Sequence, residues 1–307
     1  MKSAICTLFE GDYHLGAAAL VNSLSALGFK GTVYAGYRGP LPPWASTTDP
    51  TGTVNVTPEL AITFVPLTTT IHLTNYKPDF MLDLWQNHCP DAQALFYFDP
   101  DIVIKGRWSF FEEWADFGIA VCRDINGDMP NTHPIRQMWR RILQPLGINF
   151  IRPMDMYVNG GFVGVTKQQQ SFIALWQKIQ SQMVKCGVTQ DALGVGDRTL
   201  PFSCRDQDAL NIACMAHTGE VSIIGADGMD FQWGGGGYVM SHAAGGVKPW
   251  RKAFLRTLLT KAQRPSLADR AFFQNLDGPL RPFSPGVLKR KRLALTIACA
   301  LGRFGGR

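Results

Sequence analysis

The stretch Ala94-Leu95-Phe96-Tyr97-Phe98 is followed directly by Asp99-Pro100-Asp101, and this junction decides the predicted fold. Five consecutive apolar or aromatic residues are typical of a strand that is buried on both faces. The two acidic residues at the end of this strand are not needed for packing. Because ligands of open α/β sheets bind at the carboxyl ends of the strands, we expect the chemistry of this protein at this junction.

Shorter apolar runs and amphipathic segments alternate on both sides of this strand. Strands are predicted over residues 4–9, 32–37, 62–67, 118–122, 157–165 and 221–224, with helices over 15–27, after Pro78, after Pro134, over 172–184 and from Asp206. The Pro- and Thr-rich residues 39–57 are predicted to form a long loop. Alternating strands and helices predict a single Rossmann-like α/β domain with a mostly parallel mixed sheet and helices on both faces.

The net charge of +6 is divided unevenly along the 307 residues. Residues 251–307 hold 13 Lys and Arg and two acidic residues, a charge of +11, so the other residues carry 17 − 22 = −5. We therefore predict an acidic domain over residues 1–255 and a basic, Pro-containing tail over residues 256–307. A basic helix is expected over residues 251–261, a loop over 264–286 and a second helix over 287–301.

The tail places basic residues directly before apolar ones, Lys289-Arg290-Lys291-Arg292 before Leu293-Ala294-Leu295. This order favours an anchor on an anionic membrane surface over a nucleic-acid site, in which aromatic residues would alternate with basic ones. No nucleic-acid partner is expected, and the alternative is a solvated, disordered tail.

The location predicted from the sequence is the cytoplasm, with the tail on the inner face of the membrane. The seven scattered cysteines form no CxxC pair and suggest reduced thiols. No secretory signal and no apolar run long enough to span a membrane are evident.

Asp99 and Asp101 form a DxD motif that suits a hard divalent cation. Two adjacent carboxylates repel each other unless a cation lies between them. The alternative for this short motif is a turn in which the two aspartates cap backbone amides.

A second motif spans His242-Ala243-Ala244-Gly245-Gly246-Val247-Lys248-Pro249-Trp250. Its glycines would allow the backbone to approach an anion, and Lys248 offers a positive charge suited to a diphosphate. A Gly-rich loop that leads into a helix with Pro249 at its first position is the alternative.

This second motif resembles the H-x-x-G-x-x-K-P-W signature of glycosyltransferase family 8. These are retaining enzymes with the GT-A fold, and they include glycogenin and bacterial lipopolysaccharide galactosyl- and glucosyltransferases. Four further elements occur in the family's order: Thr7 with Asp12-Tyr13, Asp99-Pro100-Asp101, Asn159-Gly160-Gly161, and Asp206-Gln207-Asp208-Ala209-Leu210-Asn211. The resemblance covers roughly residues 3–255. The sequence differs from better-known members in the insertion at 39–57 and in the second glycine after Asn159.

The resemblance implies a site for a UDP-sugar and for Mn²⁺ or Mg²⁺. The implied metal ligands are Asp99, Asp101 and His242, and Asp99, Gly245 and Lys248 belong to the implied donor site, with Lys248 at the phosphates. The remaining implied roles are Thr7, Asp12 and Tyr13 at the uracil, Lys77 near the donor, and Asn159, Asp206 and Gln207 near the sugar.

For three of these residues an ordinary structural role is the alternative. Tyr13 could be an aromatic residue packed at a helix start, Lys77 a solvated charge, and Asp206 a residue that complements a helix dipole.

The predicted function is transfer of a hexose from a UDP-sugar to a saccharide or glycolipid acceptor, with retention. One alternative is a nucleotidyltransferase that makes nucleotide-sugars, although the turn Phe9-Glu10-Gly11-Asp12 lacks the basic residue such enzymes favour there. The other alternative is a non-catalytic module that the tail attaches to anionic lipid or nucleic acid.

Overall fold

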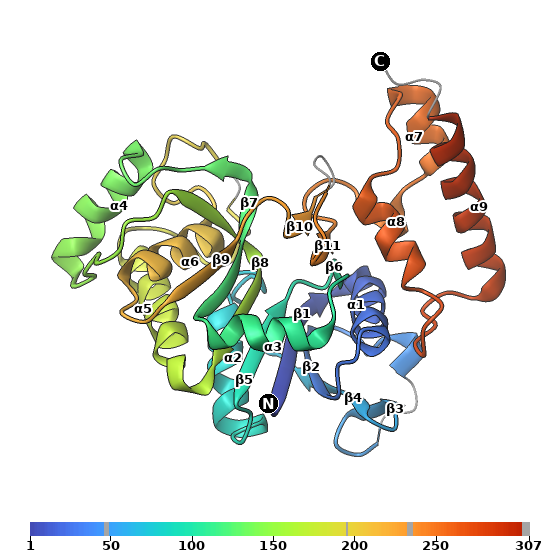
Figure 1. Ribbon diagram of the computed structural model, residues 1–307, viewed down its shortest axis with the longest axis horizontal. Coiled ribbons are helices and arrows are strands. Elements are labelled where there is room, and N and C mark those ends of the chain that lie inside the picture. The colour runs from blue at the N-terminus through green and yellow to red at the C-terminus, as the bar shows by residue number, and fades with distance from the viewer. Residues whose placement is uncertain (46–48, 195, 232–235, 303–307) are drawn as a thin grey trace.

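The computed structural model describes residues 1–45, 49–194, 196–231 and 236–302, and it forms an α/β structure around a central sheet (Figure 1). The strands are β1 (Ser3–Glu10), β2 (Gly31–Arg38), β3 (Thr53–Thr57), β4 (Leu60–Pro66), β5 (Ala94–Phe98), β6 (Ile102–Ile104), β7 (Ile119–Asp128), β8 (Met156–Thr166), β9 (Val221–Ile224), β10 (Met229–Asp230) and β11 (Met240–His242). The helices are α1 (His14–Ala26), α2 (Lys77–Asp83), α3 (Trp108–Asp116), α4 (Pro134–Leu143), α5 (Ser171–Lys185), α6 (Arg205–Ala216), α7 (Phe254–Lys261), α8 (Leu267–Gln274) and α9 (Pro285–Leu301).

Within the described residues, the main sheet has eight strands in the order β3-β4-β2-β1-β5-β8-β7-β9. Neighbours from β4 to β5 pair in parallel, β8 lies antiparallel between β5 and β7, and β9 is parallel to β7. A smaller sheet has the order β10-β11-β6, with β11 antiparallel to β6. The predicted α/β fold with a mostly parallel mixed sheet is confirmed.

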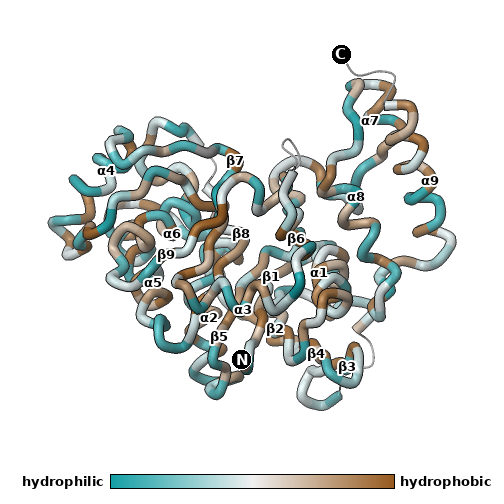
Figure 2. Tube along the Cα trace, viewed as in Figure 1, coloured by the Kyte–Doolittle hydropathy of each residue, from teal (hydrophilic) through white to brown (hydrophobic). Residues whose placement is uncertain are grey.

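Hydrophobic clusters cover both faces of the main sheet. Along β1, Cys6 and Leu8 face a cluster built with α2, α4, α5 and α6, whereas Ile5 and Phe9 face one built with α1 and α3. Figure 2 shows the apolar colouring of the central strands that separate these two clusters. Burial on both faces explains why the predicted strands appear in the sequence as nearly continuous apolar runs.

The predicted loop over residues 39–57 is wrong at its end, where β3 pairs antiparallel with β4. The hydroxyl groups of Thr53 and Thr63 lie 3.0 Å apart across this pair. Thr53-Val54-Asn55-Val56-Thr57 alternates polar and apolar residues, which is the pattern of an edge strand with one exposed face. Residues 46–48 of the predicted loop lie outside the described residues.

Four further elements differ from the sequence prediction. Strands β6 and β10 and helix α3 were not predicted, and β7 continues to Asp128 instead of ending at Cys122. The sequence of α3, Trp-Ser-Phe-Phe-Glu-Glu-Trp-Ala-Asp, is rich in aromatic residues, which lose side-chain freedom in helices. Its helical form is stabilised by burial of Trp108, Phe111 and Trp114 against the sheet.

The expected loop over residues 264–286 is wrong in part, because α8 forms within it. Ser266 and Asp269 make a reciprocal capping box at the start of this helix. Asp269 is buried and also accepts two hydrogen bonds from the Lys252 ammonium group, at 2.7 and 2.8 Å. A single two-turn helix bounded by prolines leaves too short a periodic pattern to be recognised in the sequence.

Helices α7, α8 and α9 pack at one end of the molecule, where α8 lies beside α1 (Figure 1). Phe272, Phe273, Leu295 and Ala298 share a buried cluster with Trp250 and residues of α1 and β6. In addition, Lys291 of α9 donates a 2.7 Å hydrogen bond to the carbonyl oxygen of Trp250. The alternative of a disordered tail is therefore wrong for these three helices, while residues 303–307 lie outside the described residues.

The described part of the chain contains no helix of sufficient length and hydrophobicity to cross a membrane. None of the seven cysteines, all of which lie within the described residues, forms a disulfide bond.

Candidate active site

A cavity of about 330 Å³ opens beside the carboxyl ends of β1 and β5. Its wall includes Asp99 and Asp101 from the β5–β6 junction, and the Asn159-Gly160-Gly161 segment of β8. The start of α6 and the segment that follows β11 also line it. The predicted location of the site, at the carboxyl end of β5, is where the structure has this cavity.

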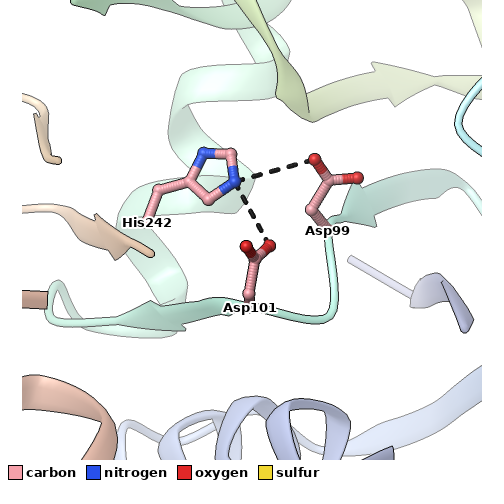
Figure 3. A group of neighbouring side chains, drawn as sticks. All are labelled: Asp99, Asp101 and His242. Carbon is pink, nitrogen blue, oxygen red and sulfur yellow. Dashed lines mark ion pairs between the residues drawn. The ribbon is translucent and has the colours of Figure 1, made fainter. Parts of the chain in front are cut away.

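Asp99, Asp101 and His242 converge at this cavity (Figure 3). One ligand atom from each residue lies within 4.8 Å of the other two. The Nε2 atom of His242 is 3.2 Å from Oδ1 of Asp101 and 3.7 Å from Oδ2 of Asp99. The antiparallel pairing of β11 with β6 aligns His242 with Ile102, which explains how residues 140 positions apart meet. Two carboxylates and one imidazole form a donor set that suits a divalent cation.

Lys248 lies next to this triad. Its ammonium group is 2.6 Å from Oδ2 of Asp101 and 2.9 Å from the carbonyl oxygen of Ala243. Gly245 and Gly246, with φ of +65° and +49°, form the turn that returns the chain to the cavity. Burial opposes ionisation of Asp101, yet the neighbouring imidazole of His242 and ammonium group of Lys248 hold the pKa of this carboxyl below its usual range.

Lys77 is fully buried, so the alternative of a solvated charge is wrong. Its ammonium group is 3.1 Å from Oδ1 of Asp99 and 3.0 Å from Oδ2 of Asp206, and it donates to the carbonyl oxygen of Gly160 at 2.8 Å. Burial lowers the pKa of Lys77, but Asp99 and Asp206 outweigh it and raise that pKa above its usual value. Burial raises the pKa of Asp206, although Lys77 counteracts this effect.

The formal charges of the aspartates and lysines at the cavity nearly cancel. The carboxylates of Asp99, Asp101 and Asp206 contribute −3 and the ammonium groups of Lys77 and Lys248 contribute +2, which leaves −1 with a neutral His242. A divalent cation would bring the sum to +1. Such a site attracts an anionic ligand once the cation is bound.

The two glycines of the Asn159-Gly160-Gly161 segment lie against other residues of the site. A Cβ atom at Gly161 would lie 2.5 Å from Cε1 of His242, so only glycine leaves room for the imidazole. Gly160 donates its amide hydrogen to Oε1 of Gln207 at 2.9 Å, and the amide group of Asn159 donates to Asp124 at 2.6 Å. The second glycine, Gly161, is absent from the pattern that the sequence resembles, and here it leaves space for the imidazole of His242.

The three residues predicted to contact the uracil differ in whether they line the cavity. Tyr13 lines the cavity, and the cationic groups of Lys248 and Arg251 each lie 5.6 Å from the centre of its ring. Asp12 pairs with Arg251 outside the cavity lining. Thr7 is fully buried in β1, and its hydroxyl group has no hydrogen-bond partner among the described residues.

Several residues of the site were not singled out in the sequence. Tyr97 donates from its hydroxyl group to Asp99, while His72 and Leu193 line the cavity from segments without a motif. The position of Tyr97 two residues before Asp99 is a signal that could have been used, because alternate strand residues share a face. No comparable pattern marks His72 or Leu193.

Comparisons with known proteins show the fold. No protein-family model matches the chain, and no curated protein matches it. Among solved structures, the chain is similar to the apo structure of WbbM, a bifunctional glycosyltransferase, with a TM-score of 0.56 and 13% identity. The match covers 94% of this chain and 51% of that chain, so this chain spans about half the length of its neighbour. The likeness shows that the two chains share a fold.

The contact of Gly161 with His242 predicts a specific effect of Gly161→Ala. The added methyl group would displace the buried imidazole, and overpacking of this kind costs about 1–3 kcal/mol of stability. We expect denaturant unfolding to show this loss and Mn²⁺ titration calorimetry to show weaker binding. Gly286→Ala is the control, since a Cβ there meets nothing within 4 Å. Equal Mn²⁺ affinity in the two variants would contradict the assigned role of the glycine.

Asp208 predicts a pH dependence of stability. This buried carboxyl accepts from the hydroxyl group of Tyr157 at 2.6 Å, and burial raises its pKa to about 7. The folded state then binds the proton more tightly than the unfolded state, so the contribution of Asp208 to stability decreases as pH rises from about 4 to about 7. The decrease amounts to at most about 4 kcal/mol, from about three pKa units.

Asp208→Asn should remove this part of the pH dependence. We expect the free energy of unfolding to vary less between pH 4 and pH 7 in this variant than in the unmodified protein. Asp128→Asn, at an exposed carboxylate, is the matched control. The same pH profile for both variants and the unmodified protein would show that Asp208 does not titrate in this range.

Proposed function

We propose that this chain is a metal-dependent glycosyltransferase that transfers a hexose from a UDP-sugar to a saccharide or glycolipid acceptor, with retention of configuration. The observation that carries the proposal is the convergence of Asp99, Asp101 and His242 at a cavity, in a fold shared with a glycosyltransferase. Asp99, Asp101 and His242 would hold Mn²⁺ or Mg²⁺. Such a cation supplies positive charge to the diphosphate that leaves as the glycosidic bond breaks.

Lys248 and Tyr13 support a donor site on one side of the triad. Lys248 is fixed by Asp101 and by the turn at Gly245, so its ammonium group can contact the β-phosphate without reorganising. Tyr13 offers an aromatic ring to the uracil at the cavity wall. Thr7 and Asp12 are not among the residues that line the cavity, which favours Tyr13 as the principal contact of the base.

Asp206, Gln207 and Asn159 would face the donor sugar. Because Oε1 of Gln207 accepts from Gly160, its Nε2 group is left to donate to a sugar hydroxyl. Asp206 lines the cavity while Lys77 holds one of its oxygens. Retention would need either a carboxylate nucleophile, for which Asp206 is the residue to test, or same-face attack in which the acceptor hydroxyl gives its proton to the leaving phosphate.

We further propose that the acidic domain and the basic tail have separate functions. Residues 1–255 would carry both substrate sites, and residues 256–307 would attach the protein to the anionic inner face of the cytoplasmic membrane. An exposed stripe on α9 supports this, since Leu293, Ile297 and Leu301 follow the exposed Lys289 and Arg290. Figure 2 shows apolar and polar residues mixed along α9. Lys291 and Arg292 have partners within the protein, so only part of the basic run faces outward.

Asp101→Asn tests the catalytic proposal. Loss of this carboxylate charge should reduce Mn²⁺-dependent release of UDP in a screen of UDP-sugars by at least about 100-fold, the size typical of a lost electrostatic contact in a transition state. Asp91→Asn, at an exposed surface pair, is the matched control and should keep full activity. If UDP-sugar were instead formed from sugar phosphate and UTP with release of pyrophosphate, a nucleotidyltransferase would replace the present proposal.

Vesicle flotation tests the membrane proposal. The full chain should float with vesicles that contain anionic lipid, and the paired substitution Leu293→Glu with Ile297→Glu should abolish flotation because it adds charge to the apolar stripe. Phe117→Glu changes an apolar residue that is 73% exposed on another face and should float normally. Equal flotation of all three proteins would exclude α9 as the attachment surface.

A further inference from the structure

Tyr97 is buried beneath the cavity and donates a hydrogen bond to Asp99, and it has no role in the reaction proposed above. Its side chain is 1% exposed, within the core beneath the cavity. Its hydroxyl group donates a 2.7 Å hydrogen bond to Oδ1 of Asp99, the same oxygen that lies 3.1 Å from the ammonium group of Lys77. The other oxygen, Oδ2, faces Nε2 of His242 at 3.7 Å. Asp99 therefore has one oxygen held by the protein and one directed toward the triad.

Asp101 is divided in the same way. Lys248 holds Oδ2 of Asp101 at 2.6 Å, and Oδ1 faces Nε2 of His242 at 3.2 Å. Each carboxylate thus presents a single oxygen to the space in front of His242, where Figure 3 shows both contacts. Free rotation of either carboxylate would break at least one charge-assisted hydrogen bond, which is stronger than a neutral one.

We infer that Tyr97 is a positioning residue that fixes the Asp99 carboxylate for one-oxygen coordination and thereby sets both the affinity and the identity of the cation. This inference rests on the proposed metal-dependent function. Lys77 alone is less suited to the role, because its ammonium group is shared among Asp99, Asp206 and Gly160. Among the described residues, the hydroxyl group of Tyr97 donates to Asp99, which lies two residues further along the chain, and its ring is held in the core.

The expected effect on cation choice follows from ligand number. Mg²⁺ accepts six ligands in a strict geometry that suits one oxygen from each carboxylate, whereas Ca²⁺ takes six to eight and often uses both carboxylate oxygens. A carboxylate prevented from offering its second oxygen therefore disfavours Ca²⁺. Groups that orient metal ligands typically contribute 10- to 100-fold to affinity.

Tyr97→Phe removes the hydroxyl group and keeps the ring. We expect the dissociation constant for Mn²⁺, measured by titration calorimetry on the full chain without donor sugar, to rise about 10-fold. The constant for Ca²⁺ should change much less, so the preference for Mn²⁺ over Ca²⁺ should decrease. Both constants are measured in the absence of any reaction, which separates cation binding from activity.

Tyr157→Phe is the matched control. Tyr157 is also 1% exposed and also donates from its hydroxyl group to an aspartate, Asp208, away from the triad. It should lose a comparable amount of thermal stability and keep the Mn²⁺ affinity of the unmodified protein. Circular dichroism melting of both variants shows that each is folded under the conditions of the titration.

The outcomes distinguish the inference from the proposed function. Weaker Mn²⁺ binding and a smaller preference over Ca²⁺ in Tyr97→Phe alone support the role of Tyr97. If the unmodified protein binds Mn²⁺ and both variants bind it equally well, the positioning role is wrong while the proposed function stands. An unmodified protein that binds no Mn²⁺ and shows no cation-dependent UDP release overturns both.

Discussion

Repulsion among three carboxylates is the constraint on which the rest of this structure depends. Asp99, Asp101 and Asp206 meet around one cavity, and two lysines are withdrawn from water to balance them. A buried ammonium group without partners would be strongly destabilising. Each lysine therefore fixes the position of the element that carries it, α2 for Lys77 and the segment after β11 for Lys248. The site and its surrounding frame are stabilised by the same contacts.

The strand order explains why these groups meet although they are distant in sequence. Strand β5 is central, and its antiparallel neighbour β8 brings Asn159-Gly160-Gly161 beside the end of β5. There the backbone amide of Asp99 donates a 2.7 Å hydrogen bond to the carbonyl oxygen of Gly161. The small sheet then returns His242 to the start of β6. A single insertion in β8 or β11 would reverse the facing of these side chains, since strand residues alternate between faces.

The sequence was sufficient for the elements that repeat a clear pattern. The buried strand before Asp99, the helices with an apolar stripe and the glycine-rich motif from His242 to Lys248 were all predicted at the correct places. The meeting of Asp99, Asp101 and His242 also followed, although only through the resemblance to a known signature. The hydrophobic pattern of a sequence indicates where a strand ends, but it does not indicate which strands are neighbours in the sheet.

What the sequence could not provide depends on tertiary contacts. Helix α8 is stabilised by the burial of Phe272 and Phe273 and by the Lys252–Asp269 pair, none of which leaves a periodic mark in eight residues. The burial of Lys77 was equally hidden, because a lysine before a proline at a helix start is ordinarily solvated. The role proposed for Tyr97 depends on which oxygen of Asp99 each neighbour contacts.

The hydrogen bond from Lys291 to the carbonyl oxygen of Trp250 has a consequence for how such a protein can be divided. Trp250 lies two residues after Lys248 and packs edge-on against Tyr13, with their ring centres 5.4 Å apart. Helix α9 thus supports the wall of the cavity from behind. The tail is not an interchangeable module: transplanting it onto another domain, or deleting it, would alter the packing behind Tyr13 at the cavity wall.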